Sequence, residues 1–255
     1  MALILLANTK GGSGKTTAAL VLAGELLTHN ARIVLLEGDP NRPLVSWAET
    51  RGAAIIETSK HRAKSAEEAR KIIEEAAGDT ERLVVIHDDD QEGVFEWIEG
   101  ASAWAHFVIA DPEGSPNEWL TDVASQADLV LIPFAPSALD ARQVSRTVQV
   151  LNKVSKRTGR AVNYRLLLTR ANPIATRDER EIRQSLEKNG LSLLRCTLRE
   201  RPAYRGLFKL DATMEELSPE TVNGLDGARK NASEFAREIL DTLRANATAD
   251  SEVAQ

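Results

Sequence analysis

The residues best suited to chemistry lie in one short segment that could bind phosphate groups, Lys10-Gly11-Gly12-Ser13-Gly14-Lys15-Thr16-Thr17. Glycines let successive backbone N–H groups point at phosphate oxygens, and the start of a following helix adds partial positive charge. The Lys15 ammonium can reach the β- and γ-phosphates of a nucleotide, and the Thr16 hydroxyl can ligate Mg²⁺. The segment lies between an apolar run, Ala2–Ala7, and a helical pattern, Thr16–Thr28, which is the context of a P-loop. The predicted nucleotide-binding residues are Gly11, Gly12, Ser13, Gly14, Lys15, Thr16 and Thr17.

Two carboxylates follow apolar runs at points where strands of a parallel sheet would end. The run Arg32–Leu36 leads to Asp39, and the run Phe107–Ala110 leads directly to Asp111. Because parallel strands present their carboxyl ends at one edge of the sheet, both side chains should lie beside the P-loop. Asp111 fits a Walker B carboxylate that holds Mg²⁺ together with Thr16. On its own, Asp39 would be interpreted as a turn residue before proline, and the nearby P-loop favours a functional role.

The P-loop departs from the general pattern because Thr9 occupies the usual first glycine position and an additional lysine, Lys10, follows it. In this respect the sequence resembles the ParA/MinD family of deviant Walker A, or signature-lysine, ATPases. The resemblance implies that Lys10 reaches across an ATP-sandwich homodimer, where a cation stabilises transition-state charge. It also implies that Asp39 orients the attacking water, so that Lys10, Lys15 and Asp39 form the catalytic set. Glu37 replaces the family's first aspartate, which leaves its role open, and a solvated loop lysine is the alternative for Lys10.

A second resemblance concerns the nucleotide base. The segment Leu166–Pro173 is similar to the one that follows a late strand in MinD-like proteins. This similarity implies that Asn172 contacts adenine, because an amide can pair a donor and an acceptor with the edge of the base. A turn or capping asparagine before proline is an almost equal alternative. The cofactors implied by the family are ATP and Mg²⁺.

The resemblance to this family extends from Leu3 to about Leu243. Three segments are most similar to the ParA-like ATPases of the virulence C operon, which assist conjugative DNA transfer: Asp111–Asn117, Ala127–Leu139 and Arg199–Tyr204. The family implies an ATP hydrolase that dimerises on binding Mg-ATP, binds DNA non-specifically as the dimer, and serves plasmid or chromosome partition with a ParB-like or cargo adaptor. It would be cytoplasmic and associate with the nucleoid when ATP-bound. A conjugation accessory that binds a specific DNA site or relaxosome, and a MinD-like positioning ATPase, stay open as alternatives.

The formal net charge of −6 argues at first against binding to nucleic acid. The charge is unevenly distributed, however: Lys156–Lys209 holds 14 Lys and Arg against 5 Asp and Glu, whereas Glu74–Glu99 holds 10 acidic residues and a single basic one. Non-specific DNA binding needs phosphate contacts only, so this basic segment is the predicted DNA surface. A solvated, self-paired surface is the alternative. The candidate DNA-contacting residues are Arg177, Arg180, Arg183, Arg199, Arg201 and Arg205.

The elements that must position these residues alternate along the whole chain of 255 residues. Apolar runs alternate with helical patterns such as Ser137–Arg157 and Ala228–Leu243, which predicts an α/β fold with a doubly wound, mostly parallel sheet and helices on both faces. With no linker, residues 1–245 form a single predicted P-loop ATPase domain, and 246–255 a flexible polar tail. The one cysteine, Cys196, excludes an intramolecular disulfide. No run reaches the roughly 18 apolar residues of a membrane span, and the tail Arg244–Gln255 is small and acidic without an apolar anchor, so no membrane contact is expected.

Overall fold

The computed structural model describes residues 1–253, and they contain one eight-stranded sheet in the order β3-β4-β2-β5-β1-β6-β7-β8. Every neighbouring pair of strands is parallel, which confirms the predicted doubly wound sheet. The strands are β1 (Ala2–Leu6), β2 (Ile33–Gly38), β3 (Ala54–Glu57), β4 (Leu83–His87), β5 (Phe107–Pro112), β6 (Leu129–Phe134), β7 (Tyr164–Ala171) and β8 (Leu198–Arg199).

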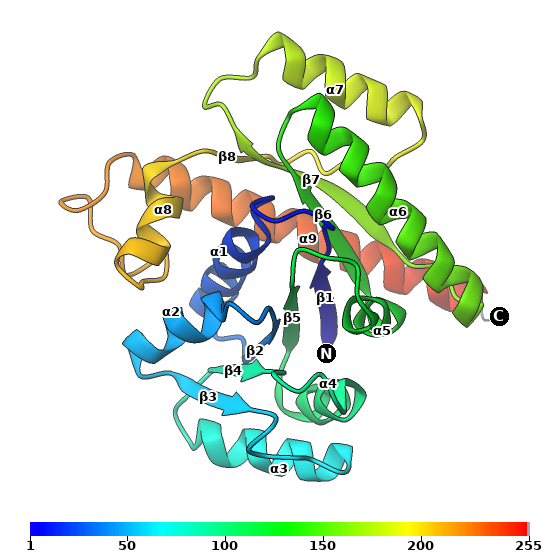
Figure 1. The fold of residues 1–255 in the computed structure, drawn as a ribbon. Helices are drawn as coiled ribbons and strands as arrows, with labels where there is room; N and C mark the ends of the chain where they lie inside the picture. Colours follow the sequence, from blue (N-terminus) through cyan, green and yellow to red (C-terminus); the bar gives the residue numbers. More distant parts are fainter. Residues whose placement is uncertain (254–255) are drawn as a thin grey trace.

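Helices cover both faces of the sheet (Figure 1). One face packs against α1, α2, α8 and α9, and the other packs against α3, α4, α5, α6 and α7. Their bounds are α1 (Lys15–Thr28), α2 (Pro43–Arg51), α3 (Ala66–Ala77), α4 (Val94–Trp104), α5 (Glu118–Gln126), α6 (Ala138–Thr158), α7 (Arg177–Lys188), α8 (Pro202–Lys209) and α9 (Leu225–Val253).

The continuous apolar runs of the sequence follow from this double coverage. In β1, Ile4 and Leu6 belong to one core cluster, whereas Leu3 and Leu5 belong to the cluster on the opposite face. All four side chains are buried, because successive residues of a strand point to opposite faces and both faces are covered. A run without polar alternation is therefore what a central parallel strand requires.

The strand order places the predicted site at one point of the sheet. β1 lies between β5 and β6, so the chain winds in one direction from β1 to β2 and in the other direction from β1 to β6. Such a switch point opens a crevice at the carboxyl ends of the strands. The register pairs Glu37 at the end of β2 with Asp111 at the end of β5, next to the loop that follows β1.

Two elements differ from the sequence-based expectation. The last helix runs to Val253 instead of Leu243, because the alanine-rich segment after it favours continued helix. Most of the predicted flexible tail is thus helical, and the Asn246 amide donates to the Asp128 carbonyl at 3.3 Å. Residues 254–255 of that tail lie outside the described residues. The strand expected within 191–198 is reduced to β8 and an isolated bridge between Leu166 and Leu193.

Candidate functional site

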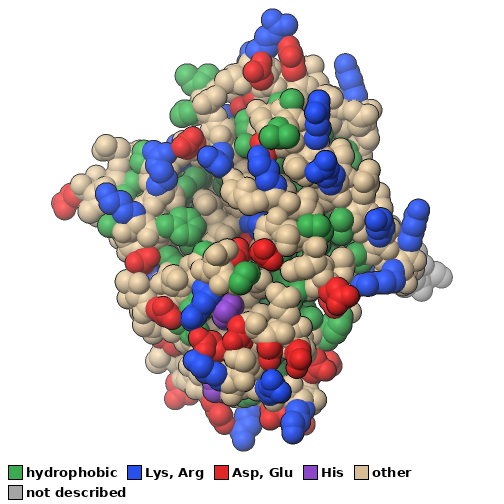
Figure 2. Space-filling view, in the orientation of Figure 1, with side chains coloured by type: hydrophobic (Ala, Val, Ile, Leu, Met, Phe, Trp, Pro, Cys, Tyr) green, Lys and Arg blue, Asp and Glu red, His purple; other side chains and the backbone are tan. Residues whose placement is uncertain are grey.

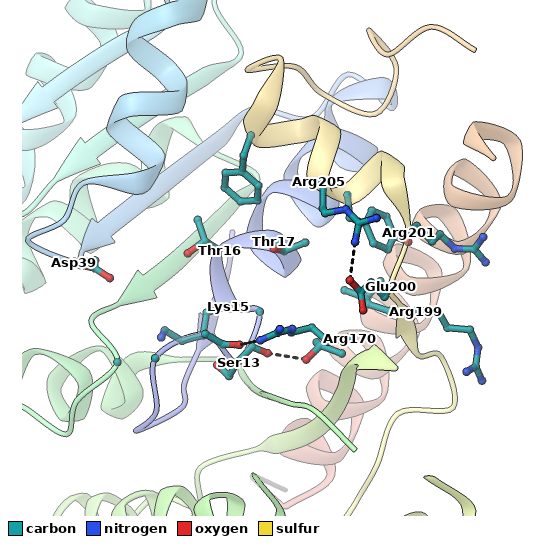
Figure 3. A pocket seen from close by; sticks show the side chains of 18 residues that line it. Ser13, Lys15, Thr16, Thr17, Asp39, Arg170, Arg199, Glu200, Arg201 and Arg205 are labelled. Atoms are coloured by element: carbon teal, nitrogen blue, oxygen red, sulfur yellow. Dashed lines mark hydrogen bonds and ion pairs between the residues drawn. The ribbon is translucent and has the colours of Figure 1, made fainter. Parts of the chain in front are cut away.

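The phosphate loop between β1 and α1 is tied down from the end of β7. Thr169 Oγ1 donates to the Ser13 carbonyl at 2.6 Å, and Arg170 Nη1 donates to the Gly12 carbonyl at 2.8 Å (Figure 3). Gly14 has a φ of 91° and precedes α1, and a Cβ on it would lie 3.2 Å from Thr169. With two carbonyls bound on the β7 side, the loop keeps backbone N–H groups free for a ligand. The sequence analysis missed Thr169 and Arg170 as loop supports.

The Mg²⁺ ligands predicted from the sequence meet at the start of α1. Thr16 Oγ1 donates to Asp111 Oδ2 at 2.6 Å, and Lys15 is buried beside them. Burial raises the pKa of Asp111 to about 6, although the hydrogen bond from Thr16 and the charge of Lys15 both lower it. A buried carboxylate beside an ammonium and a hydroxyl is the arrangement expected where a divalent cation and phosphates are to bind.

Unpartnered polar atoms show that this site is built for a ligand. Asp111 Oδ1 and Ser13 Oγ are buried and have no hydrogen-bond partner within the described chain. Buried polar atoms are normally satisfied, so these two atoms at the phosphate loop are available to a ligand that binds there. The donor set of one hydroxyl and one carboxylate fits Mg²⁺, which takes its other ligands from phosphates and water. No cluster of three or more His, Cys, Asp or Glu suited to a metal occurs among the described residues.

The two carboxylates after β2 have different roles in the structure. Asp39 is half-buried and lines the same cavity as the phosphate loop, and its Oδ1 accepts from the backbone and the side chain of Asn41. Glu37 is buried, and its two oxygens accept from the N–H groups of Leu44 and Val45 at the start of α2. Burial, opposed by those two hydrogen bonds, raises the pKa of Glu37 to about 7. Glu37 thus fixes the β2–α2 turn that carries Asp39, a role that its sequence position had left open.

The sequence analysis also missed a group of buried contacts at the ends of β2, β3 and β4. The indole Nε1 of Trp119 donates to the buried Asp88 carboxylate at 2.6 Å, and Thr58 Oγ1 donates to the same carboxylate at 3.0 Å. The Trp119 ring lies so close to Gly38 that a Cβ there would be 2.8 Å from it. Burial raises the pKa of Asp88 to about 6 despite both hydrogen bonds. These contacts join α5 to the ends of β2, β3 and β4, and the residues involved lie too far apart in sequence to form a motif.

The phosphate loop opens into a cavity of about 430 Å³, within the range of small-molecule sites. One wall is the loop with Asp39 and Gly114, and the other is the segment from Leu198 to Phe208, which includes Tyr204 (Figure 3). A Cβ on Gly114 would lie 2.8 Å from the Gly11 nitrogen, so the turn after β5 touches the phosphate loop. Asn172, the predicted adenine contact, is exposed outside this cavity, and its carbonyl accepts from Arg199 at 2.6 Å.

Lys10 points away from the cavity and forms an ion pair with Asp140 at 2.8 Å. Asp140 lies in the first turn of α6, where Ser137 caps the helix by accepting from the Asp140 nitrogen. Burial opposes the shift, but hydrogen bonds from Lys10 and Ser137 and the charge of Lys10 bring the pKa of Asp140 below its ordinary value. The sequence analysis had no signal for this pair, because the partners are 130 positions apart.

Five of the six candidate DNA-contacting arginines donate hydrogen bonds within the chain. Arg199 lies against Glu179 and Arg205 against Glu200, at 3.1 and 2.6 Å respectively. Arg183 donates to the Leu194 carbonyl and to Thr197. Arg177 pairs with Glu181 at 2.7 Å, and Arg180 donates to the Ala175 carbonyl at 3.4 Å. Arg199, Arg201 and Arg205 line the nucleotide-sized cavity.

Comparisons with known proteins agree with this geometry. The family model described as VirC1 protein matches residues 1–218. A relative called Protein ParA from Rhizobium radiobacter is 29% identical over 245 residues, covering 95% of this chain and 98% of the relative. Protein virC1 from the same organism is 25% identical over 209 residues and covers 81% and 80% respectively. The apo structure of McdA from Cyanothece superposes with a TM-score of 0.68 at 17% identity, covering 94% of this chain and 99% of that one, and McdA has also been solved as an ATP complex.

Proposed function

The chain belongs to the VirC1 protein family, within the ParA/MinD group of P-loop ATPases that position or partition cargo, and from this premise we propose that it is an ATP-driven DNA-binding switch. In this proposal Mg-ATP binding produces a homodimer, the dimer binds DNA non-specifically, and slow hydrolysis of ATP to ADP and phosphate releases it. The role is partition of a plasmid or chromosome in the cytoplasm, with a ParB-like or cargo adaptor that stimulates hydrolysis.

The observation that carries the proposal is the group of unpartnered atoms around the phosphate loop. Ser13 Oγ and Asp111 Oδ1 have no partner in the described chain, and Lys15 is a buried cation with no ion pair there. Phosphate oxygens satisfy cations and donors, and Mg²⁺ would neutralise phosphate charge between Thr16 and Asp111. No apolar ligand would satisfy these groups, so a nucleoside triphosphate is the ligand that the chemistry favours.

In this proposal each predicted site residue has a separate role in binding or hydrolysing ATP. Lys15 binds the β- and γ-phosphates, Thr16 and Asp111 hold the metal, and Asp39 positions the attacking water. Lys10 completes the neighbouring protomer's site, which requires it to leave Asp140. Lys10 is the more exposed partner of that pair, and Asp140 keeps its hydrogen bond from Ser137 when Lys10 leaves. The free chain therefore keeps Lys10 in a resting position from which a partner's phosphates can attract it.

Dimerisation and hydrolysis test this proposal directly. We expect light scattering to give a dimer for the wild type with Mg-ATP and a monomer without nucleotide, and a monomer for Lys15→Gln under both conditions. Asp39→Ala should remain dimeric with ATP while phosphate release falls to background, because it removes the water-positioning carboxylate but no phosphate contact. A wild-type monomer at every nucleotide concentration would refute the sandwich mechanism.

A conjugation accessory ATPase that recognises a specific DNA site or relaxosome is the second candidate, and the VirC1 family match favours it. The two candidates differ in their DNA preference. A pull-down at fixed salt should retain random and transfer-origin duplexes equally for a partition ATPase, whereas a conjugation accessory should prefer the origin by the several kcal/mol that base contacts supply.

A MinD-like positioning role on a membrane is a weaker candidate. Within residues 1–253 no helix is long and apolar enough to cross a membrane. Flotation with anionic liposomes in the presence of ATP tests peripheral binding. We expect the protein to stay at the bottom of the gradient, and robust flotation would support the membrane alternative.

A further inference from the structure

Helix α6 carries a row of basic side chains along its outer face. Arg142, Arg146, Lys153 and Lys156 are all exposed, and none has a hydrogen bond or an ion pair within the described chain. On a helix of 3.6 residues per turn these positions fall within an arc of about 80° and span about 21 Å along the axis. We call these four residues the α6 stripe. Figure 2 shows Lys and Arg side chains following the course of α6, whereas Asp and Glu gather over the opposite half of that face.

No carboxylate on α6 shares the stripe. The helix has one acidic residue, Asp140, and it is buried on the inward side, where Lys10 and Ser137 bind it. On α3 and α7, by contrast, exposed cations pair at i,i+4 spacing, as Arg70 does with Glu74 and Arg177 with Glu181. Such pairing is the ordinary way in which a solvated helix face balances its charge. The α6 stripe therefore keeps a net positive charge that the rest of the chain does not cancel.

The chemistry of the stripe fits the backbone of duplex DNA better than a membrane. A helix that binds a membrane surface must offer an apolar face to the lipid. Of the apolar residues of α6, Val144, Leu151 and Val154 are buried in the core, and Leu139 in the first turn is the large apolar side chain that is exposed. Between the cations the outer face shows only Gln149 and small polar residues. Four unpaired cations in a line, with a single exposed leucine instead of an apolar face, match a row of phosphates.

We propose that the α6 stripe is the principal DNA-backbone contact of this protein, in place of the arginines of α7 and the β8–α8 segment. This inference rests on the proposed DNA-binding function and locates its surface. The stripe begins two residues after Asp140, the partner of Lys10, so it adjoins the element that the dimer must engage. Two more arginines follow the stripe near the end of α6, but both are paired. Arg157 forms an ion pair with Asp122, and Arg160 forms one with Asp128.

The test compares two matched double variants of the full chain. Arg146→Gln with Lys153→Gln removes an i,i+7 pair from the stripe. Lys230→Gln with Arg237→Gln removes an i,i+7 pair from α9, where both side chains are likewise exposed and unpaired among the described residues. Fluorescence anisotropy with a random-sequence duplex and Mg-ATP gives the affinity over a salt series. Light scattering and a thermal melt of the same samples report dimerisation and folding.

We expect the α6 variant to lose about tenfold or more in DNA affinity and its salt slope to fall by at least about 2, because each lost phosphate contact removes roughly one counterion. The α9 variant should match the wild type, and both should dimerise and melt normally. Equal DNA affinity for the α6 variant and the wild type would refute the α6 stripe as the DNA contact without refuting the proposed DNA-binding function. A wild type that dimerises but binds no DNA, or that binds only anionic vesicles or an acidic protein, would overturn both the stripe and the DNA-binding function.

Discussion

The phosphate loop and the basic C-terminal segment are both rich in groups that could bind anions, yet the fold treats them in opposite ways. Around the loop, Ser13 Oγ and Asp111 Oδ1 are buried without partners in the described chain. In the basic segment, Arg183, Arg199 and Arg205 are engaged with acceptors of the same chain. The first region keeps polar groups available for a ligand, whereas most of the candidate arginines in the second are already bound within the described chain, with the buried and unpartnered Arg201 Nε as an exception.

This difference separates two quantities: the formal charge, which counts every Lys and Arg, and the available charge, which counts only those side chains without a partner in the chain. A count along Lys156–Lys209 gives an excess of basic residues. However, an arginine that is bound to a buried carboxylate, as Arg199 is to Glu179, stabilises the fold and has little charge left for a phosphate. Unpartnered atoms, and rows of unpaired cations on a helix without exposed carboxylates, are the better guides to a binding surface, and they point to the loop and to α6.

The strongest test of the comparison is the replacement of Lys15 in the loop. In Lys15→Gln the site loses its buried cation, so two charge-assisted contacts to phosphate disappear. At about 1.5 kcal/mol each, we expect nucleotide affinity to fall by about 100-fold. Titration with a fluorescent ATP analogue measures it, with Lys230→Gln as a control for loss of an exposed lysine. An affinity within threefold of the wild type would show that the loop does not carry the binding.

The two regions could be predicted from the sequence only where the contacting residues lie close together along the chain or where the parallel sheet brings strand ends together. The loop was predictable because its parts follow one another between β1 and α1, and because parallel strands bring the ends of β2 and β5 to the same edge. Glu37 stayed open because its role is set by the start of α2. The pairs Lys10–Asp140 and Trp119–Asp88 join distant elements, and no local pattern encodes them. The internal partners of the arginines in the basic segment could not be read from the sequence for the same reason, and DNA contact by these arginines stays a prediction.

The second test removes a partner from the basic segment. Glu179 is 3% exposed and binds Arg199, so Glu179→Gln leaves a partly buried guanidinium without its counter-ion. We expect a loss of about 2–3 kcal/mol in the free energy of unfolding, equivalent to a fall in Tm of about 4–12 °C. The matched control is Glu181→Gln, whose partner Arg177 is exposed and which should cost less than about 0.5 kcal/mol. Equal Tm values for the two variants would mean that the Arg199–Glu179 pair is not structural.

The third test probes the loop's dependence on close backbone contact. A methyl group on Gly114 would meet the Gly11 nitrogen at 2.8 Å, so Gly114→Ala must displace the turn after β5 or the loop. We expect the ligand-free chain to lose about 1–2 kcal/mol of stability, as for other overpacked sites. Gly11→Ala is the reciprocal control, because a Cβ at Gly11 meets no atom within 4 Å. Urea unfolding without nucleotide distinguishes them, and a Gly11 variant as unstable as the Gly114 variant would contradict this packing.

The smallest effect is expected at Arg177, which the charge count nominated for DNA binding. Its side chain is 85% exposed and paired with Glu181. An exposed i,i+4 pair contributes about 0.3–0.5 kcal/mol, so Arg177→Gln should change the Tm by no more than about 1–2 °C. Because the guanidinium already has a carboxylate partner, DNA affinity with Mg-ATP should stay within about twofold of the wild type. A tenfold loss of DNA affinity in this variant, with folding and dimerisation intact, would show that an internally paired arginine can still bind phosphate, and the distinction between paired and available charge would no longer locate the DNA surface.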